Sequence, residues 1–417
     1  MPNISIKNHP LVRTLVGLRG NPRACVFTEP MWGLSMNLCL PYASVYMLAM
    51  GMTDTQVGIV ASIYMFSQML FALLSGMIVD KLGRRLSTAV FDFFAWSVPC
   101  LIWAGSQGFW FFAGAALLNG MMKVTTVSWD CLLVEDAPPD KVTQLYTWVI
   151  ICGNMSALFA PIASIMVSRL TMVPAVRILY INAFVVMTAK IIILYKLSRE
   201  TRVGVARREA AKGWTLRAVI GNYAQSVRNI RASRGTSFAI LISVLVEIVG
   251  VIGYTFWQII ASRRVGVPDA LLPIFPMTKS VLSIAFLFGV IGRIKQTKLR
   301  TPLFGGFACA IAGAVLLIVA PPNSALGYAV LFLSLAFEAL GGATLNTLRE
   351  SLVAIHVRPE DRSGVMALLQ TLVMLVSVPF GYIGGVLSDI SKPLPFVMSI
   401  GLLAIGLAVT AAVYRDA

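Results

Sequence analysis

The sequence has few charged residues and almost no histidine. Only 12% of its 417 residues are Asp, Glu, Lys or Arg, whereas a soluble domain carries roughly 25%. The two histidines, His9 and His356, argue against a histidine metal site or a histidine base. The sequence also lacks the Gly-x-x-x-x-Gly-Lys-Ser/Thr loop that cradles nucleotide phosphates. We therefore expect no catalytic residue, metal or cofactor, and no enzymatic activity.

Cysteine is scarce as well, and its spacing carries no redox or metal motif. None of the six cysteines forms a Cys-x-x-Cys pair, and most fall inside apolar segments. They are expected to pack as small apolar residues. The six are Cys25, Cys39, Cys100, Cys131, Cys152 and Cys309.

Long apolar runs dominate what is present. Apolar residues make up 58% of the sequence, and the mean hydropathy is +0.81. The runs are about 20 residues long, which is the length that crosses a bilayer core about 30 Å thick. They must be helices, because lipid offers no partner for an unpaired backbone amide. We predict twelve spans, at residues 29–50, 55–80, 86–106, 108–134, 142–168, 174–195, 236–261, 268–292, 302–320, 324–350, 362–388 and 393–413.

The spans divide the chain into two groups of six. A segment at 1–28 precedes a predicted bundle at 29–195, and a basic linker at 196–234 leads to a second bundle at 235–417. The net charge is +16, and the basic residues concentrate in alternate loops, most densely in the linker. By the positive-inside rule, both termini and the linker are expected in the cytoplasm. This placement favours contact with anionic membrane lipids and argues against nucleic acid as a partner.

The second half of the sequence echoes the first. A proline with acidic and basic neighbours follows both the fourth and the tenth predicted spans, at 135–141 and 356–364. Pro161 in the fifth span likewise matches Pro379 in the eleventh. A duplicated six-helix unit predicts two pseudo-symmetric bundles, with a binding site between them near the membrane midplane.

A ten-residue loop between the second and third spans carries the most specific pattern. It reads Gly-x-x-x-Asp-Lys-x-Gly-Arg-Arg from Gly76 to Arg85. This spelling, at this place, resembles the signature loop of the major facilitator superfamily, and the resemblance covers nearly the whole chain. It implies an all-α membrane protein with twelve transmembrane helices in two six-helix bundles. The corresponding loop of the second half, 289–295, keeps glycine and basic residues but has no aspartate.

The resemblance also implies that this loop latches the two bundles when the cytoplasmic side is closed. Gly76 would let two helices approach closely. Asp80 would face the start of the eleventh helix near Ser363, where the helix dipole favours a carboxylate by about 0.3–1 kcal/mol. Asp92, in the third span, is expected to support the loop's arginines. The predicted latch residues are Gly76, Asp80, Lys81, Gly83, Arg84 and Arg85.

Several ionisable residues lie near the middle of predicted spans, where a charge costs about 2.5–3.5 kcal/mol. They sit on polar stripes of helical period in the fourth, seventh, eighth and tenth spans. The resemblance implies that the fourth, seventh and tenth line a central cavity. We expect Lys279 to pair with Glu247 or Glu338, and leave open whether such pairs carry protons, contact substrate or only stabilise the fold. The candidates are Lys123, Asp130, Glu247, Lys279, Glu338, Asn346 and Arg349.

The resemblance implies a secondary active transporter that moves a small-molecule substrate by alternating access. Proton coupling is expected because carboxylates lie inside the spans. The protein is expected to be a monomer in the plasma (inner) membrane, in contact with protons and membrane lipids. Two alternatives stay open: a lipid or amphiphile translocase, and a non-transporting membrane receptor or sensor.

Overall fold

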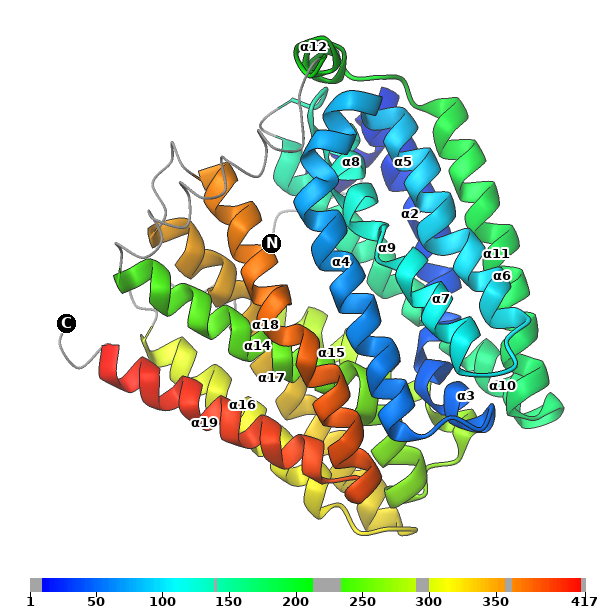
Figure 1. Ribbon diagram of the computed structural model, residues 1–417, viewed down its shortest axis with the longest axis vertical. Helices are drawn as coiled ribbons and strands as arrows, with labels where there is room; N and C mark the ends of the chain where they lie inside the picture. The colour runs from blue at the N-terminus through cyan, green and yellow to red at the C-terminus, as the bar shows by residue number, and fades with distance from the viewer. Residues whose placement is uncertain (1–9, 139–140, 213–233, 290–299, 357–361, 414–417) are drawn as a thin grey trace, which may run out of the picture.

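Helices make up almost all of the computed structural model shown in Figure 1. It describes residues 10–138, 141–212, 234–289, 300–356 and 362–413, and no strand occurs within these ranges. The predicted all-α fold is confirmed. Parts of the expected terminal segment (1–9), of the basic linker (213–233) and of the loop at 289–295 lie outside the described residues.

The first half contains short and long helices in alternation. Some neighbouring helices form one continuous helical stretch that contains a π-helical or 3-10 turn. For example, the π-helical turn η3 joins α5 to α6. The helices are α1 (Pro10–Gly17), α2 (Gly20–Cys39), η2 (Leu40–Tyr42), α3 (Ala43–Ala49), α4 (Asp54–Leu82), α5 (Arg84–Asp92), η3 (Phe93–Ser97), α6 (Val98–Ala104), α7 (Phe109–Asn119), α8 (Met122–Val134), α9 (Val142–Ala157), α10 (Ala160–Leu170) and α11 (Met172–Leu197).

The second half follows a short linker helix, α12 (Arg202–Ala210). Its helices are longer and less interrupted than those of the first half. They are α14 (Arg234–Ile260), η5 (Ala261–Val265), η6 (Asp269–Leu271), α15 (Ile274–Gly289), α16 (Arg300–Val319), α17 (Ala325–His356), α18 (Arg362–Ile390) and α19 (Leu394–Val413).

Nine helical stretches of the described chain are long and apolar enough to cross a membrane. The other three predicted spans correspond to α2 with α3, to α7 with α8, and to α15. Helix α2 begins at Gly20, nine residues before the predicted start of the first span at residue 29. Pro22 is tolerated there because the first amides of a helix have no partner within it. Asn21 anchors this turn by accepting a hydrogen bond from the Arg199 amide at 2.7 Å.

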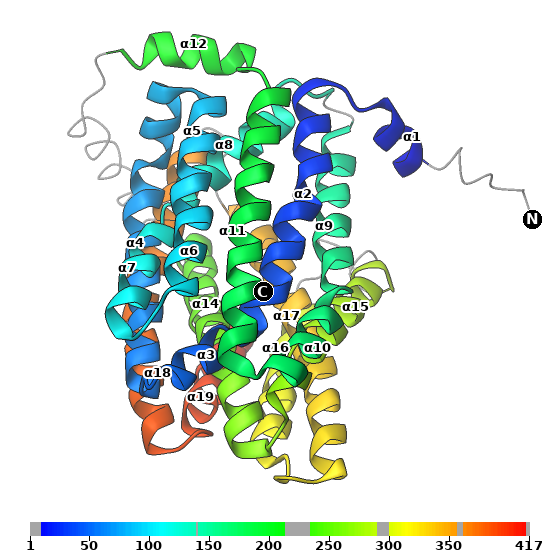
Figure 2. The same ribbon diagram turned by 90° about the vertical axis from the view of Figure 1, so that its right-hand side faces the viewer.

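The two halves form two groups of helices that converge at one end. In Figure 1 the blue-to-green helices of the first half lie on the right, and the green-to-red helices of the second half lie on the left. In Figure 1 their axes diverge towards the end that carries α12, and Figure 2 shows α12 lying across this end of the first half. We call this end the basic face. The end that carries the α3–α4 and α18–α19 turns is the opposite face.

Helices α4 and α18 join the two halves through glycine backbone. A Cβ atom on Gly58 would lie 2.9 Å from the Cα atom of Gly385 and closer still to the carbonyl oxygen of Gly381. Side chains are therefore excluded from this crossing, as in other small-residue helix contacts within membranes. The two bundles touch backbone to backbone on the opposite-face side.

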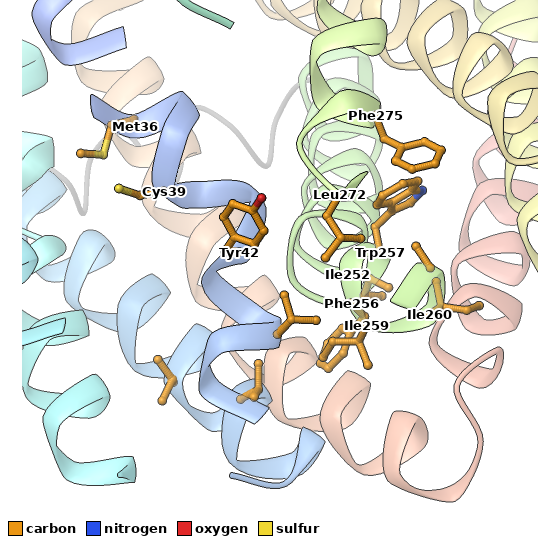
Figure 3. Packing of buried hydrophobic residues seen from close by; sticks show 14 of the residues in the cluster. Met36, Cys39, Tyr42, Ile252, Phe256, Trp257, Ile259, Ile260, Leu272 and Phe275 are labelled. Atoms are coloured by element: carbon orange, nitrogen blue, oxygen red, sulfur yellow. The ribbon is translucent and has the colours of Figure 1, made fainter. Parts of the chain in front are cut away.

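An apolar cluster continues this contact between the halves. Tyr42 of η2 is completely buried and belongs to the same cluster as Trp257, Leu272 and Phe275 of the second half. Figure 3 shows these side chains on facing helices, with Ile252 and Phe256 of α14 beside them. The hydrophobic core thus crosses the boundary between the bundles.

Candidate functional site

A cavity with two lobes lies between the bundles. The larger lobe has a volume of about 620 Å³ and the smaller about 420 Å³. Leu40 of η2 and Gly250 and Tyr254 of α14 line both lobes, so the lobes are neighbours. These volumes fall in the range of about 300–1,000 Å³ that suits small organic ligands.

The larger lobe contains an ion pair from the second bundle. Lys279 of α15 lies 3.2 Å from the carboxylate of Glu338 on α17. The side chain of Lys279 is 45% exposed and that of Glu338 19%, so the ammonium group is the more open partner. Of the two partners that the sequence left open, the structure brings Lys279 to Glu338.

A second ion pair joins the other two candidate charges of this bundle. Arg349 of α17 donates to Glu247 of α14 at 3.0 Å, and Glu247 lines the smaller lobe. Lys123, on α8 of the first bundle, lies within electrostatic range of both groups. The carboxylate attracts its ammonium group and the guanidinium repels it, so a cation of one bundle faces an ion pair of the other.

The remaining candidates lie apart from these pairs. Asn346 is exposed in the larger lobe and donates to the carbonyl of Gly342 at 2.9 Å. Asp130 receives a long hydrogen bond of 3.5 Å from the Tyr146 hydroxyl and is separated from Lys123 along α8. Asn119, the last residue of α7, precedes these two residues of α8, and its side-chain amide donates to the Ala95 carbonyl at 2.6 Å.

A polar cluster joins the halves at the opposite face, and sequence reasoning missed it. Lys392, after α18, lies 2.7 Å from the buried carboxylate of Asp54 at the start of α4. The amides of Asp54 and Thr55 donate to Asp389 at 3.1 and 2.9 Å. The first amides of α4 lack partners within their own helix, so a carboxylate from α18 satisfies them. This cluster ties the bundles together on the side where their axes converge.

The signature loop forms a network within the first bundle. Gly83 adopts φ 89°, a conformation that favours glycine, and it turns the chain between α4 and α5. Arg84 donates to Asp80 at 2.7 Å and to Glu135 at 3.2 Å. The Arg84 and Arg85 amides both donate to Glu200, at 2.9 and 3.1 Å. The loop is therefore held rigidly at the basic face.

The bundle-to-bundle part of the predicted latch involves residues beyond those described. The side chain of Ser363 lies outside the described residues, whereas Asp80 is engaged with Arg84. Gly76 has open space where a Cβ would stand, and Lys81 is exposed. The close helix approach expected at Gly76 is thus absent from the described part of this conformation.

Asp92 does not support the loop's arginines as expected. Its carboxylate lies 2.6 Å from Lys190 of α11, and both side chains are almost fully buried. Lys190 lies near the end of its predicted span, 174–195, and is therefore not among the mid-span charges. The partner could not be chosen from sequence because 98 residues separate the pair.

A family model described as the Major Facilitator Superfamily matches residues 31–376. The chain belongs to the major facilitator superfamily. It is therefore a membrane transporter and not an enzyme. No curated protein matches the sequence itself.

Solved structures of other superfamily members share this fold. A nucleoside transporter, NupG, aligns over 95% of this chain and 99% of its own, with a TM-score of 0.73 and 14% identity. The human organic anion transporter MFSD10 (TETRAN) covers 96% and 99%, with a TM-score of 0.64 and 16% identity. A POT peptide transporter in complex with alafosfalin covers 94% of each chain, with a TM-score of 0.67 and 13% identity. At such identities the likeness extends to the fold alone.

Proposed function

We propose that this transporter carries a small organic ion by alternating access and is driven by a proton gradient. The observation that carries the proposal is the contrast between two places in the molecule. Two ion pairs, Lys279–Glu338 and Glu247–Arg349, are in or beside one cavity. The Asp54–Lys392 cluster joins the bundles at the opposite face. A midplane site with one face held shut is what one half of an alternating-access cycle requires.

The composition of the cavity supports an organic ion as the substrate. Aromatic and aliphatic groups make up most of its walls, including Trp32, Tyr64 and Trp257. Ionised groups inside a membrane protein are costly and mark substrate or ion pathways. A ligand with an apolar body and one charged group would contact both the apolar side chains and the ionised groups of the cavity wall.

Loop charge supports placing the basic face in the cytoplasm. Helix α12 at this face carries Arg202, Arg207 and Arg208, as the positive-inside rule requires of a cytoplasmic segment. Both termini would then be cytoplasmic, in the plasma (inner) membrane, with the protein acting as a monomer. The predicted boundaries of the two bundles, 29–195 and 235–417, remain part of this proposal.

The largely apolar cavity also favours a second candidate, an amphiphile translocase. Residues such as Val246, Leu335 and Leu403 of the larger lobe would accept an acyl chain beside the Lys279–Glu338 pair. This candidate keeps alternating access and differs in the source of the ligand. It takes its substrate from the bilayer, whereas the first candidate takes it from water.

Reconstitution into liposomes that contain a pH-sensitive dye tests both candidates. A panel of organic anions, zwitterions and cations is added outside, and a fluorescent phospholipid analogue is followed in parallel. Solute-dependent proton flux, reduced in Glu338→Gln and unchanged in Glu209→Gln, is the expected result. Glu209 is a suitable control because it is exposed on α12 and far from the cavity.

Three results would contradict the first candidate. Translocation of the lipid analogue without movement of any soluble ion would favour the amphiphile translocase. Ligand binding with neither solute nor lipid movement would favour a receptor. Solute movement that does not depend on the proton gradient would contradict proton coupling and leave the transport of an organic ion standing.

A further inference from the structure

A cluster of ionisable groups lies inside the first bundle and takes no part in the ion pairs of the cavity. Asp92 of α5 and Lys190 of α11 form a pair at 2.6 Å, with side chains only 1% and 4% exposed. Glu29 of α2 lies within electrostatic range of Lys190, Asp92 and Asp130. Glu29 and Asp92, from two helices, therefore share one ammonium group, and Asp130 of α8 adds a third carboxyl group within range of Glu29.

The charge balance of this cluster requires a proton. With every group ionised, three carboxylates and one ammonium would carry a net charge of −2. The other neighbours in range are uncharged polar groups, the thiols of Cys25 on α2 and Cys152 on α9 and the Tyr146 hydroxyl beside Asp130. Unpaired charge within a bundle is penalised strongly by loss of solvent. At least one carboxyl group should therefore hold a proton.

Glu29 is the carboxyl group with the weakest support for its charged form. Asp92 has Lys190, and Asp130 accepts from the Tyr146 hydroxyl at 3.5 Å. Glu29 makes no hydrogen bond or ion pair with another described residue, and its side chain is half-buried. Of the three, it is the group that can take and release a proton without breaking another contact.

Two local features connect this cluster to the cavity. Trp32, one turn after Glu29 on the same face of α2, lines the smaller lobe and packs edge-on against Trp96 at 5.6 Å. Trp96 belongs to the π-helical segment η3, which begins directly after Asp92. Such π-helical turns occur frequently at functional sites. Asp92 also keeps one buried oxygen, Oδ1, without a hydrogen-bond partner in the described chain.

We propose that Glu29 is the exchangeable proton site of this transporter, held beside the fixed Asp92–Lys190 pair. In the exchange, the Glu29 carboxyl O–H bond breaks, the proton passes to water, and the carboxylate remains within electrostatic range of Lys190. Trp32, one turn from Glu29 on α2, and Trp96 both line the smaller lobe, so a change of charge at Glu29 can alter the wall that the substrate meets. The inference rests on the proposed proton coupling and assigns it to the first bundle.

Infrared spectroscopy of the full-length protein in liposomes tests this assignment without any substrate. The C=O stretch of a protonated carboxylic acid is recorded as the pH is varied over the range in which the protein stays folded. Wild-type protein should show a titrating band. The band should lose one carboxyl equivalent in Glu29→Gln, and should be retained, shifted in position, in Glu29→Asp.

Two matched variants complete the test. Asp130→Asn and Glu338→Gln should keep the titrating band, because neither removes the proposed group. A band that persists unchanged in Glu29→Gln, or that disappears in Asp130→Asn, would overturn the proposal. If the band depends on Glu29 but reconstituted protein moves no protons with any solute, the site stands and proton coupling fails.

Discussion

The glycine contact between α4 and α18 gives the most quantitative prediction. An alanine Cβ at Gly58 would lie 2.9 Å from the Gly385 Cα atom. Because non-bonded carbon atoms prefer about 3.5 Å or more, the helices must separate by at least about 0.6 Å. Overpacking of this kind costs about 1–3 kcal/mol. The cost falls only on the conformation in which the opposite face is closed, so Gly58→Ala should favour opening there.

The size of the shift follows from that energy. A free-energy change of about 1–3 kcal/mol alters an equilibrium by about 5-fold to about 140-fold. Ser44 is a suitable reporter, because it is buried and donates to the Thr255 carbonyl of the other bundle at 2.6 Å. In a background without the native cysteines, Ser44→Cys should react with an impermeant maleimide at the opposite face faster by this factor when Gly58→Ala is present.

The control is Gly114→Ala in α7, where an added Cβ meets nothing within 4 Å. It should leave labelling of Ser44→Cys unchanged. Equal labelling of wild-type and Gly58→Ala protein would refute the argument. So would an equal rise in the Gly114→Ala control, since that rise could not come from the α4–α18 contact.

Three further predictions concern charged groups. Lys190→Met should lower stability by about 3–5 kcal/mol because it strands the buried Asp92, and adding Asp92→Asn should recover much of this loss in thermal unfolding. Lys279→Met should cost only about 1 kcal/mol or less, because its side chain is 45% exposed, and a thermal double-mutant cycle with Glu338→Gln measures the coupling. Asp80→Asn should leave the protein inserted but slow its transport; transport at the wild-type rate would argue against a latch.

The spans were predictable because their signal is local. The length and composition of each apolar run indicate a span without reference to the rest of the chain. In the same way, Gly83 indicates a turn within the Gly76–Arg85 loop. Helix α2 begins ahead of the predicted first span, and residues 20–28 include Arg23 and Pro22, which look unlike a membrane helix. Asn21 in this segment accepts a hydrogen bond from the Arg199 amide, which follows α11.

The partners of the charges were not predictable, because they depend on how helices rotate against one another. The cost of an isolated Lys279 indicated that a carboxylate was needed, but helix packing selected Glu338 over Glu247. Asp54 and Lys392 lie at span ends, where charge is ordinary, so nothing in the sequence marked their contact across 338 residues. Glu29 was missed because it stood at the predicted edge of the first span.

Alternating access is most directly tested by measuring accessibility at both faces. Asn346→Cys, exposed in the larger lobe, should react with reagent supplied at the basic face in wild-type protein. In Gly58→Ala, this reactivity should fall as that of Ser44→Cys at the opposite face rises. If both positions become reactive together from their two faces, the protein is open at both ends at once and alternating access is contradicted.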